Sequence, residues 1–287
     1  MLPFALSEIA YLFIRMKFNA LCSDIDGTLL DSHRALSVRT IAAIHRLPAS
    51  VPVILASSRM PAAMRHLQVE LGRPHEPLIC FNGGYVLWER NGTEAPEVWT
   101  SIYIPLSICQ HIVTLAKSTP LHVSLFESDH WYAAGEDSWT LREAGITKVR
   151  PTFKALDRVL KDWEEQRKGA HKIMCMGPEA DIETMYHTLT ETFPDDLHVY
   201  RSKSTYLELA PKSISKATGL ALVMHKLNID MQTVIAFGDN YNDIEMLQAV
   251  GWGVAVANAR DEVKAVAREI APTHKADGVA ITVEKYF

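Results

Sequence analysis

Short apolar runs alternate with helical stretches in the first third of this 287-residue chain. The runs at 19–23, 51–56 and 78–81 are mainly apolar, which is typical of strands buried on both faces. Two helix signals lie between them, one opening at Ser37 and one with Pro61 in its first turn. Because neighbouring parallel strands need a crossover, usually a helix, this alternation predicts an α/β fold with a parallel sheet covered on both faces.

The first of these helices is expected to run from Ser37 to about Leu47. Val38, Ile41 and Ile44 lie at helical spacing within it, so we expect them to share its buried face.

The pattern changes between residues 85 and 199, where shorter strand-like runs are mixed with helices. A hairpin is predicted around Asn91-Gly92, and an apolar and aromatic stretch occupies 121–133. Tyr206–Leu209 is expected to return the chain to the first domain, after which strands and helices alternate again. The mixed segment is therefore predicted to be an inserted α+β domain between two halves of a doubly wound, Rossmann-like core. The predicted boundaries are 16–85 with 200–287 for the core, 86–199 for the inserted cap and 1–15 for a non-essential N-terminal extension.

Polar side chains follow several of the predicted strands. They are Asp24, Asp26, Ser57, Ser58, Asn82, Asp239, Asn242 and Asp243, with Gly83 next to Asn82, and Lys216 opens a later helix. In doubly wound sheets, ligands bind outside the carboxyl ends of the strands. Acids at three such places can hold Mg²⁺, while a hydroxyl, a lysine and an amide can bind phosphate oxygens. Taken singly, these residues are also typical helix caps, turns or surface groups. Their joint occurrence at strand ends predicts a metal-dependent site for phosphoryl transfer.

Four of these segments, in this order, resemble the motifs of the haloacid dehalogenase-like superfamily of aspartyl phosphohydrolases. The Cof-type branch with a type IIB cap is the most similar, and the resemblance extends from Phe18 to Phe287. The matching segments are Asp24-Ile25-Asp26-Gly27-Thr28, Ser57, Lys216 and Gly238-Asp239-Asn240-Tyr241-Asn242-Asp243. Ser58 and Ala217 stand where glycine is common in the branch. Neither replacement removes a reacting group, but Ser58 adds bulk beside the phosphate-contacting hydroxyl of Ser57.

The resemblance implies a role for each matching residue. Asp24 is the nucleophile that forms an aspartyl-phosphate, and Asp26 is the acid and base. The resemblance also implies a Mg²⁺ site formed by Asp24, the backbone carbonyl of Asp26, Asp239 and Asp243. Phosphate contacts are implied for Ile25, Ser57, Ser58, Lys216 and Asn242. A weaker substrate contact is implied for Asn82 and Gly83. Asp243 is either an outer metal ligand or a group that orients the others.

Composition limits the partners and the compartment. The formal net charge of −5 offers no basic excess for nucleic acid or an anionic membrane. The apolar stretch near the N-terminus lacks a preceding basic region and is interrupted by Glu8, so neither a signal peptide nor a spanning helix is predicted. Four scattered cysteines without a Cys-x-x-Cys pair indicate buried reduced thiols. We therefore expect a cytoplasmic protein.

The expected activity is hydrolysis of small phosphorylated metabolites, such as sugar phosphates, by a Mg²⁺-dependent phosphatase. A phosphomutase on the same fold and a binding or regulatory protein that has lost catalysis are the alternatives. The presence of both Asp24 and Asp26 weighs against the second alternative. The sequence names neither the individual substrate nor the oligomeric state.

Overall fold

A computed structural model describes residues 18–287 of the protein, in two compact units. Unit 1 contains the described residues through Val53 together with Met224–Phe287, and unit 2 contains Ile54–Val223. The predicted extension at 1–15 lies outside the described residues. These units are not the predicted core and cap, whose boundaries stay a prediction.

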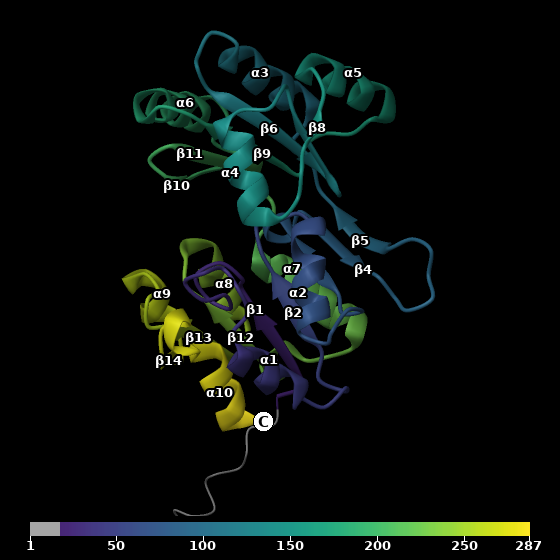
Figure 1. Ribbon diagram of the computed structural model, residues 1–287, viewed down its shortest axis with the longest axis vertical. Coiled ribbons are helices and arrows are strands. Elements are labelled where there is room, and N and C mark those ends of the chain that lie inside the picture. The colour runs from purple at the N-terminus through teal and green to yellow at the C-terminus, as the bar shows by residue number, and fades with distance from the viewer. Residues whose placement is uncertain (1–17) are drawn as a thin grey trace, which may run out of the picture. The chain divides into compact units, whose positions relative to one another are not determined.

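Unit 1 is built on parallel strands in the order β14-β13-β12-β1 (Figure 1). Their bounds are β1 (Ala20–Ser23), β12 (Val234–Gly238), β13 (Trp252–Val256) and β14 (Glu269–Ala271). Every residue of β1 and β12 is buried, as their apolar runs predict. The three-residue β14 was not predicted, because its run contains a glutamate and an exposed isoleucine.

The helices of unit 1 are α1 (Val38–His45), α8 (Ile244–Ala249), α9 (Asp261–Val266) and α10 (Gly278–Tyr286), and α1 packs against α10. The predicted N-cap of α1 is confirmed, since Thr40 N–H donates to Ser37 Oγ at 3.0 Å. The predicted buried face was wrong at Val38, whose relative exposure is 85%. The helix instead buries Thr40, Ala43 and Ile44, a face rotated by about half a turn from Val38.

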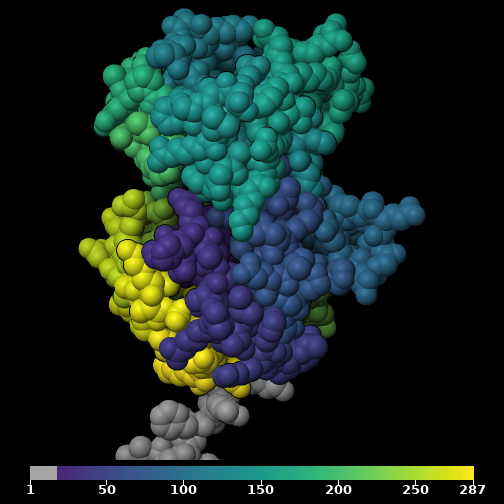
Figure 2. All heavy atoms as spheres, in the orientation of Figure 1, coloured from purple at the N-terminus to yellow at the C-terminus, as the bar shows by residue number. Residues whose placement is uncertain are grey.

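The first sheet of unit 2 continues the strand–helix pattern and then becomes antiparallel. Its strands are β2 (Val53–Ala56), β3 (Leu78–Cys80), β4 (Tyr85–Trp88) and β5 (Glu97–Ser101), with α2 (Ala62–Glu70) between the first two. β2 and β3 are parallel, whereas β3–β4 and β4–β5 are antiparallel. The hairpin around Asn91-Gly92 is confirmed, and its exposed end projects from the surface in Figure 2. Its pairing with β3 places it in this sheet, although it follows the predicted start of the inserted domain.

The second sheet of unit 2 has the order β10-β11-β9-β6-β7-β8, and only the short β7–β8 pair is parallel. The strands are β6 (His122–Glu127), β7 (His130–Ala133), β8 (Thr152–Phe153), β9 (Lys172–Met176), β10 (Leu197–Lys203) and β11 (Tyr206–Pro211). The expectation that Tyr206–Leu209 leaves the inserted domain was wrong. Leu207 and Leu209 belong to the apolar core of this sheet, and β11 pairs with both β9 and β10.

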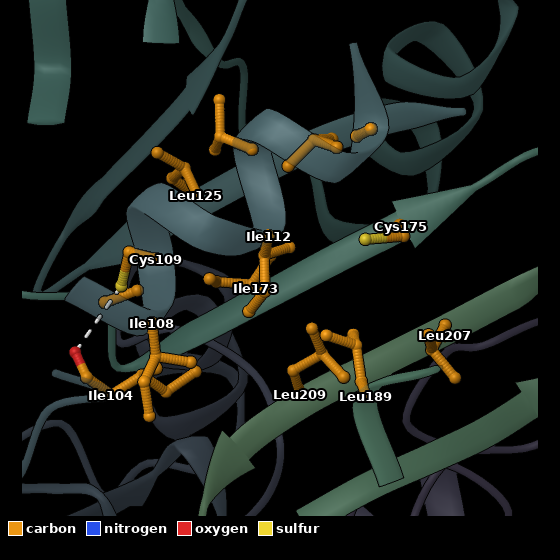
Figure 3. Close-up of a cluster of buried hydrophobic side chains, with 14 of the residues drawn as sticks. Ile104, Ile108, Cys109, Ile112, Leu125, Ile173, Cys175, Leu189, Leu207 and Leu209 are labelled. Atoms are coloured by element: carbon orange, nitrogen blue, oxygen red, sulfur yellow. Dashed lines mark hydrogen bonds between the residues drawn. The ribbon is translucent and has the colours of Figure 1, made fainter. Parts of the chain in front are cut away.

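That apolar core lies between the sheet and three helices (Figures 1 and 3). The helices are α3 (Leu106–Ala116), α5 (Leu156–Gln166) and α6 (Glu179–Thr192). Alternate residues of the strands enter the core, such as Val123 and Leu125 of β6, so the residues between them occupy the opposite face. Cys109 donates to the carbonyl oxygen of Ile104 at 3.4 Å within this core.

Helix α4 (Ser138–Thr147) was not predicted, because Thr140 is its only buried residue and it lacks an apolar stripe. Helix α7 (Lys216–Leu227) follows the six-stranded sheet in the chain. The four cysteines are free and buried, as the sequence indicates. Within residues 18–287, no helix combines the length and the apolar character that crossing a membrane requires.

Candidate active site

Three carboxylates meet at one edge of the parallel sheet in unit 1. Asp24 directly follows β1, and its N–H donates to the carbonyl oxygen of Phe237 in β12 at 3.0 Å. Asp239 directly follows β12, and Asp243 lies one short turn further on. Because β1 and β12 are adjacent and parallel, their carboxyl ends lie together. One oxygen of each of Asp24, Asp239 and Asp243 lies within 4.8 Å of the others.

The glycine after the first acids allows this approach. Gly27 has a φ of +88°, and a Cβ at this position would lie 2.5 Å from Asp239 Oδ2. Thr28 Oγ1 donates to Asp239 Oδ1 at 3.1 Å, and Asn258 Nδ2 donates to the carbonyl oxygen of Gly27 at 2.8 Å. The sequence carries no signal for Asn258, since it belongs to none of the motif segments. The Gly27 turn is thus held from two sides against Asp239.

Asp243 shapes the loop that carries Asp239. Its Oδ2 accepts hydrogen bonds from the N–H groups of Asp239 at 2.9 Å and Asn240 at 3.0 Å. The side chain of Asp243 is fully buried, and a Cβ at Gly238 would lie 2.4 Å from the Cβ of Asp243. Asp243 thus bonds to the backbone of the loop that carries Asp239, which agrees with an orienting role, and both this role and a ligand role for Asp243 stay predictions.

The acidic cluster fits a divalent cation with oxygen ligands. Asp24 and Asp243 are buried, and carboxylates this close repel one another unless a positive charge neutralises them. The carboxylate of Asp26 is outside the cluster. It is exposed, and its Oδ1 lies 3.6 Å from Arg34 Nη1, so a contribution from Asp26 to the metal would have to come from its backbone carbonyl. Ile25 is buried and Asn242 is exposed.

The second group of predicted residues lies in unit 2, around the ends of β2 and β3. Ser57 is buried directly after β2, and its Oγ accepts the N–H of Arg59 at 3.3 Å. The N–H of Asn82 donates to the carbonyl oxygen of Ser57 at 2.9 Å, which joins the two loops. Asn82 has a φ of 56° in the left-handed region, which asparagine tolerates well. Ser58 is half-buried.

Gly83 and Lys216 are brought together by close backbone packing. A Cβ at Gly83 would lie 2.3 Å from the carbonyl oxygen of Ser215, the residue before Lys216. Lys216 is the first residue of α7 and is fully buried. Burial excludes the alternative that Lys216 is an ordinary solvated surface lysine.

Polar and aromatic residues of β6 and β7 divide between two faces of the six-stranded sheet. His122 Nδ1 lies 2.7 Å from Asp137 Oδ2, and its Nε2 lies 2.8 Å from Ser124 Oγ, which also accepts from Trp131 Nε1 at 2.8 Å. These four side chains satisfy one another and hold the start of α4, where Asp137 is the N-cap. On the helix-covered face is a hollow of about 210 Å³, lined by Glu127, His130, Tyr132, Lys154, Val159, Asp162, Trp163, Gln166 and Lys168.

A charged pair that no sequence motif predicts lies on the face opposite the apolar core. Lys172 Nζ of β9 is 3.7 Å from Glu208 Oε2 of β11 and 4.8 Å from the centroid of the Phe126 ring. The alternation of side chains along a strand could have indicated it. Ile173 and Leu207 enter the core, so the neighbouring Lys172 and Glu208 lie on the opposite face.

Comparisons with known proteins identify the family. The family model described as haloacid dehalogenase-like hydrolase matches residues 21–283. A putative phosphatase of Haemophilus influenzae is 31% identical over 274 residues, covering 95% of this chain and 99% of the relative. A 5-amino-6-(5-phospho-D-ribitylamino)uracil phosphatase of Bacillus subtilis is 26% identical, covering 92% and 96%. The crystal structure of a haloacid dehalogenase-like hydrolase from Bacteroides thetaiotaomicron superimposes with a TM-score of 0.84 at 25% identity, covering 94% of this chain and all of that one.

The chain belongs to the haloacid dehalogenase-like hydrolase family. Within it, the resemblance to the Cof-type branch is confirmed, and the chain is an enzyme of the phosphoric monoester hydrolase class.

Proposed function

We propose that this enzyme is a Mg²⁺-dependent phosphatase of small phosphorylated metabolites that works through an aspartyl-phosphate. The observation that carries the proposal is the cluster of Asp24, Asp239 and Asp243, with ligand atoms within 4.8 Å of one another. When bound, Mg²⁺ would supply positive charge that lets a carboxylate approach a phosphate. Asp24, Asp239, the backbone carbonyl of Asp26 and Asp243 are the residues that would hold it.

The nucleophile and the proton-transfer group are proposed from neighbouring positions of one turn. Asp24, buried and fixed by its backbone bond to β12, attacks phosphorus. Asp26 is exposed, which suits a group that gives a proton to the leaving alkoxide and takes one from the hydrolytic water.

The phosphate is proposed to be bound by Ser57, Lys216 and Asn242, with backbone donors at Ile25 and Ser58. Ser57 and Asn82 share a hydrogen-bonded pair of loops, so their polar groups are pre-positioned rather than ordered on binding. Asn82 and Gly83 are proposed as weaker substrate contacts.

A small metabolite is the proposed substrate class, and a reducing, cytoplasmic location is proposed from the four buried free thiols. Two relatives support the substrate class by their names. One is the 5-amino-6-(5-phospho-D-ribitylamino)uracil phosphatase, and the other is an HMP-PP phosphatase of Yersinia enterocolitica that is 25% identical and covers 84% of this chain.

The test is phosphate release from p-nitrophenyl phosphate and a panel of phosphorylated metabolites, with Mg²⁺ and after its removal by EDTA. The wild type is compared with Asp24→Asn, and Asp261→Asn is the matched control because its carboxylate is 98% exposed and pairs only at the surface of α9. We expect turnover that requires Mg²⁺, is retained in the control and falls by at least about a thousandfold in Asp24→Asn.

Turnover that is independent of divalent metal, or that survives Asp24→Asn, would contradict the mechanism. A requirement for a bisphosphate activator, with phosphate returned to substrate, would indicate the phosphomutase instead. A folded, Mg²⁺-loaded protein inactive on every compound would favour a binding role.

A further inference from the structure

The turn between β6 and β7 is fastened to the beginning of α2. Pro61, at the N-cap position of α2, makes no side-chain hydrogen bond to the helix. The N–H of Ala62 donates instead to Asp129 Oδ1 at 2.7 Å, although the two residues are 67 positions apart. A carboxylate at a helix N-terminus accepts an otherwise unpaired N–H and interacts favourably with the helix dipole. Asp129 thus supplies the N-cap that the sequence around Pro61 lacks.

The next turn of α2 is held by the same carboxylate. Arg65 Nη1 lies 2.9 Å from Asp129 Oδ1 and Arg65 Nη2 lies 2.6 Å from Asp129 Oδ2, so the pairing is bidentate. Arg65 Nε also donates to Glu89 Oε1 of the segment after β4 at 2.7 Å. Burial acts to lower the pKa of Arg65, but the hydrogen bonds of Asp129 and Glu89 raise it above its ordinary value. The charged guanidinium of Arg65 therefore joins α2 to the turn that carries Asp129.

The neighbouring residue of the turn makes a second attachment. Ser128 has a φ of 50°, and its N–H donates to His171 Nδ1 at 2.9 Å. The His171 ring is stacked on Phe81, with centroids 5.3 Å apart and planes 2° from parallel. Phe81 directly precedes Asn82. The Ser128-Asp129 turn therefore contacts the start of α2 and, through His171, the turn after β3.

These two attachment points flank the loop that carries Ser57. On one side, Arg59 Nη1 donates to the carbonyl oxygen of Ala63 in α2 at 3.2 Å. On the other side, the N–H of Phe81 donates to the carbonyl oxygen of Arg59 at 3.1 Å. The loop between β2 and α2 is thus bonded to α2 and to the turn after β3, and the Ser128-Asp129 turn of the six-stranded sheet is attached to both of them.

We propose that Asp129 is a positioning residue for phosphate binding. By supplying the N-cap of α2, it fixes the loop on which the hydroxyl of Ser57 and the backbone N–H of Ser58 are presented. Asp129 acts through this loop and does not contact substrate. The inference rests on the proposed function, because it takes Ser57 and Ser58 as groups that bind phosphate.

The experiment compares Asp129→Ala and Asp129→Asn with the wild type. The measured quantities are kcat and KM for p-nitrophenyl phosphate and the inhibition constant of inorganic phosphate. For Asp129→Ala we expect KM and the inhibition constant to rise roughly tenfold, which corresponds to an N-cap contribution of about 1.4 kcal/mol, with kcat changed less than about threefold. Asp129→Asn keeps an acceptor for Ala62 N–H but loses the charge facing Arg65, so its effect should be smaller.

The control variant is Asp157→Asn, which breaks an exposed ion pair with Lys117 at the surface of the same unit. Hydrogen exchange gives a readout without activity. The amides of Ala62 and Ala63 should exchange faster in the Asp129 variants, while those of α6 should not change. Because Asp129→Asn is the milder change, it provides the test if Asp129→Ala fails to fold.

Folded Asp129 variants that bind inorganic phosphate as the wild type does would overturn the positioning role and leave the proposed function intact. A wild type that neither hydrolyses p-nitrophenyl phosphate nor binds phosphate would overturn both. Weaker phosphate binding together with faster exchange at Ala62 would support the inference.

Discussion

His171 should make the free energy of unfolding fall as the pH falls in acid, and its replacement by glutamine should remove this contribution. The ring is fully buried, and its Nδ1 accepts the N–H of Ser128, so the neutral ring carries its proton on Nε2. Nε2 lies 3.0 Å from Ser101 Oγ and donates to it. Burial and, to a smaller extent, the charge of Lys168 lower the pKa of His171 to about 3.

The sign follows from the proton uptake of the two states. In the unfolded chain the pKa is near the ordinary value of about 6.5, so between that value and about 3 the unfolded chain binds a proton that the folded protein does not. The contribution of a neutral His171 is fully present above pH 6.5 and is lost as the pH falls. Within this window the free energy of unfolding should decrease by about 1.4 kcal/mol per pH unit.

Urea denaturation at several pH values between about 7 and about 4.5 measures this slope. His171→Gln keeps a donor for Ser101 and an acceptor for Ser128, and the difference in slope between wild type and variant isolates the His171 contribution from that of the carboxylates. His45→Gln is the control, because His45 is exposed at the end of α1. Equal slopes for wild type and His171→Gln would refute the reasoning, since they would require the folded protein to protonate His171 as readily as the unfolded chain does.

Two further substitutions, each with a matched control, test the acidic cluster of unit 1 and the apolar core of unit 2. Gly27→Ala should weaken binding of Mg²⁺ by at least about tenfold in a calorimetric titration, because its Cβ would lie 2.5 Å from Asp239 Oδ2. Gly92→Ala has a similar φ of +81° with no atom within 4 Å, so it should cost only about 1–2 kcal/mol of backbone strain and leave Mg²⁺ binding unchanged. If both variants bind Mg²⁺ equally well, the close approach of Gly27 to Asp239 does not contribute to Mg²⁺ binding. Leu189→Ala, in the fully buried core of the six-stranded sheet, should lower the free energy of unfolding by about 2–5 kcal/mol in urea denaturation, whereas Val38→Ala, 85% exposed, should change it by less than about 0.5 kcal/mol. A similar small effect for both would mean that Leu189 is not packed as described.

The acidic residues were predictable because their chemistry and their strand ends are local in the sequence. An apolar run that ends in Asp24 and another that ends in Gly238-Asp239 each indicate a buried strand followed by an acid. The rule that ligands bind at the carboxyl ends of parallel strands then places Asp24 and Asp239 together, as observed. Asp243 was ambiguous, since an aspartate in a short turn can serve as a ligand or as an acceptor for backbone N–H groups.

The boundary of the inserted domain was less predictable. Tyr206–Leu209 is an apolar run that suits either sheet, and only its pairing with β9 and β10 decides where Leu207 and Leu209 are buried. Helix α4 was not predicted, because no apolar pattern marks it in the sequence. It is held by the bond between Asp137 and His122 rather than by an apolar stripe that a pattern could reveal.

The sequence by itself determined the alternation of strands and helices, the acids at the strand ends and the family resemblance, because each depends on residues close together in the chain. Only the tertiary structure decided that Asp129 caps a helix 67 residues away, that Lys216 is fully buried and that His171 is held neutral between Ser101 and Ser128. Those outcomes depend on which segments lie side by side and exclude water, and burial and long-range hydrogen bonds have no signature within a local window of sequence.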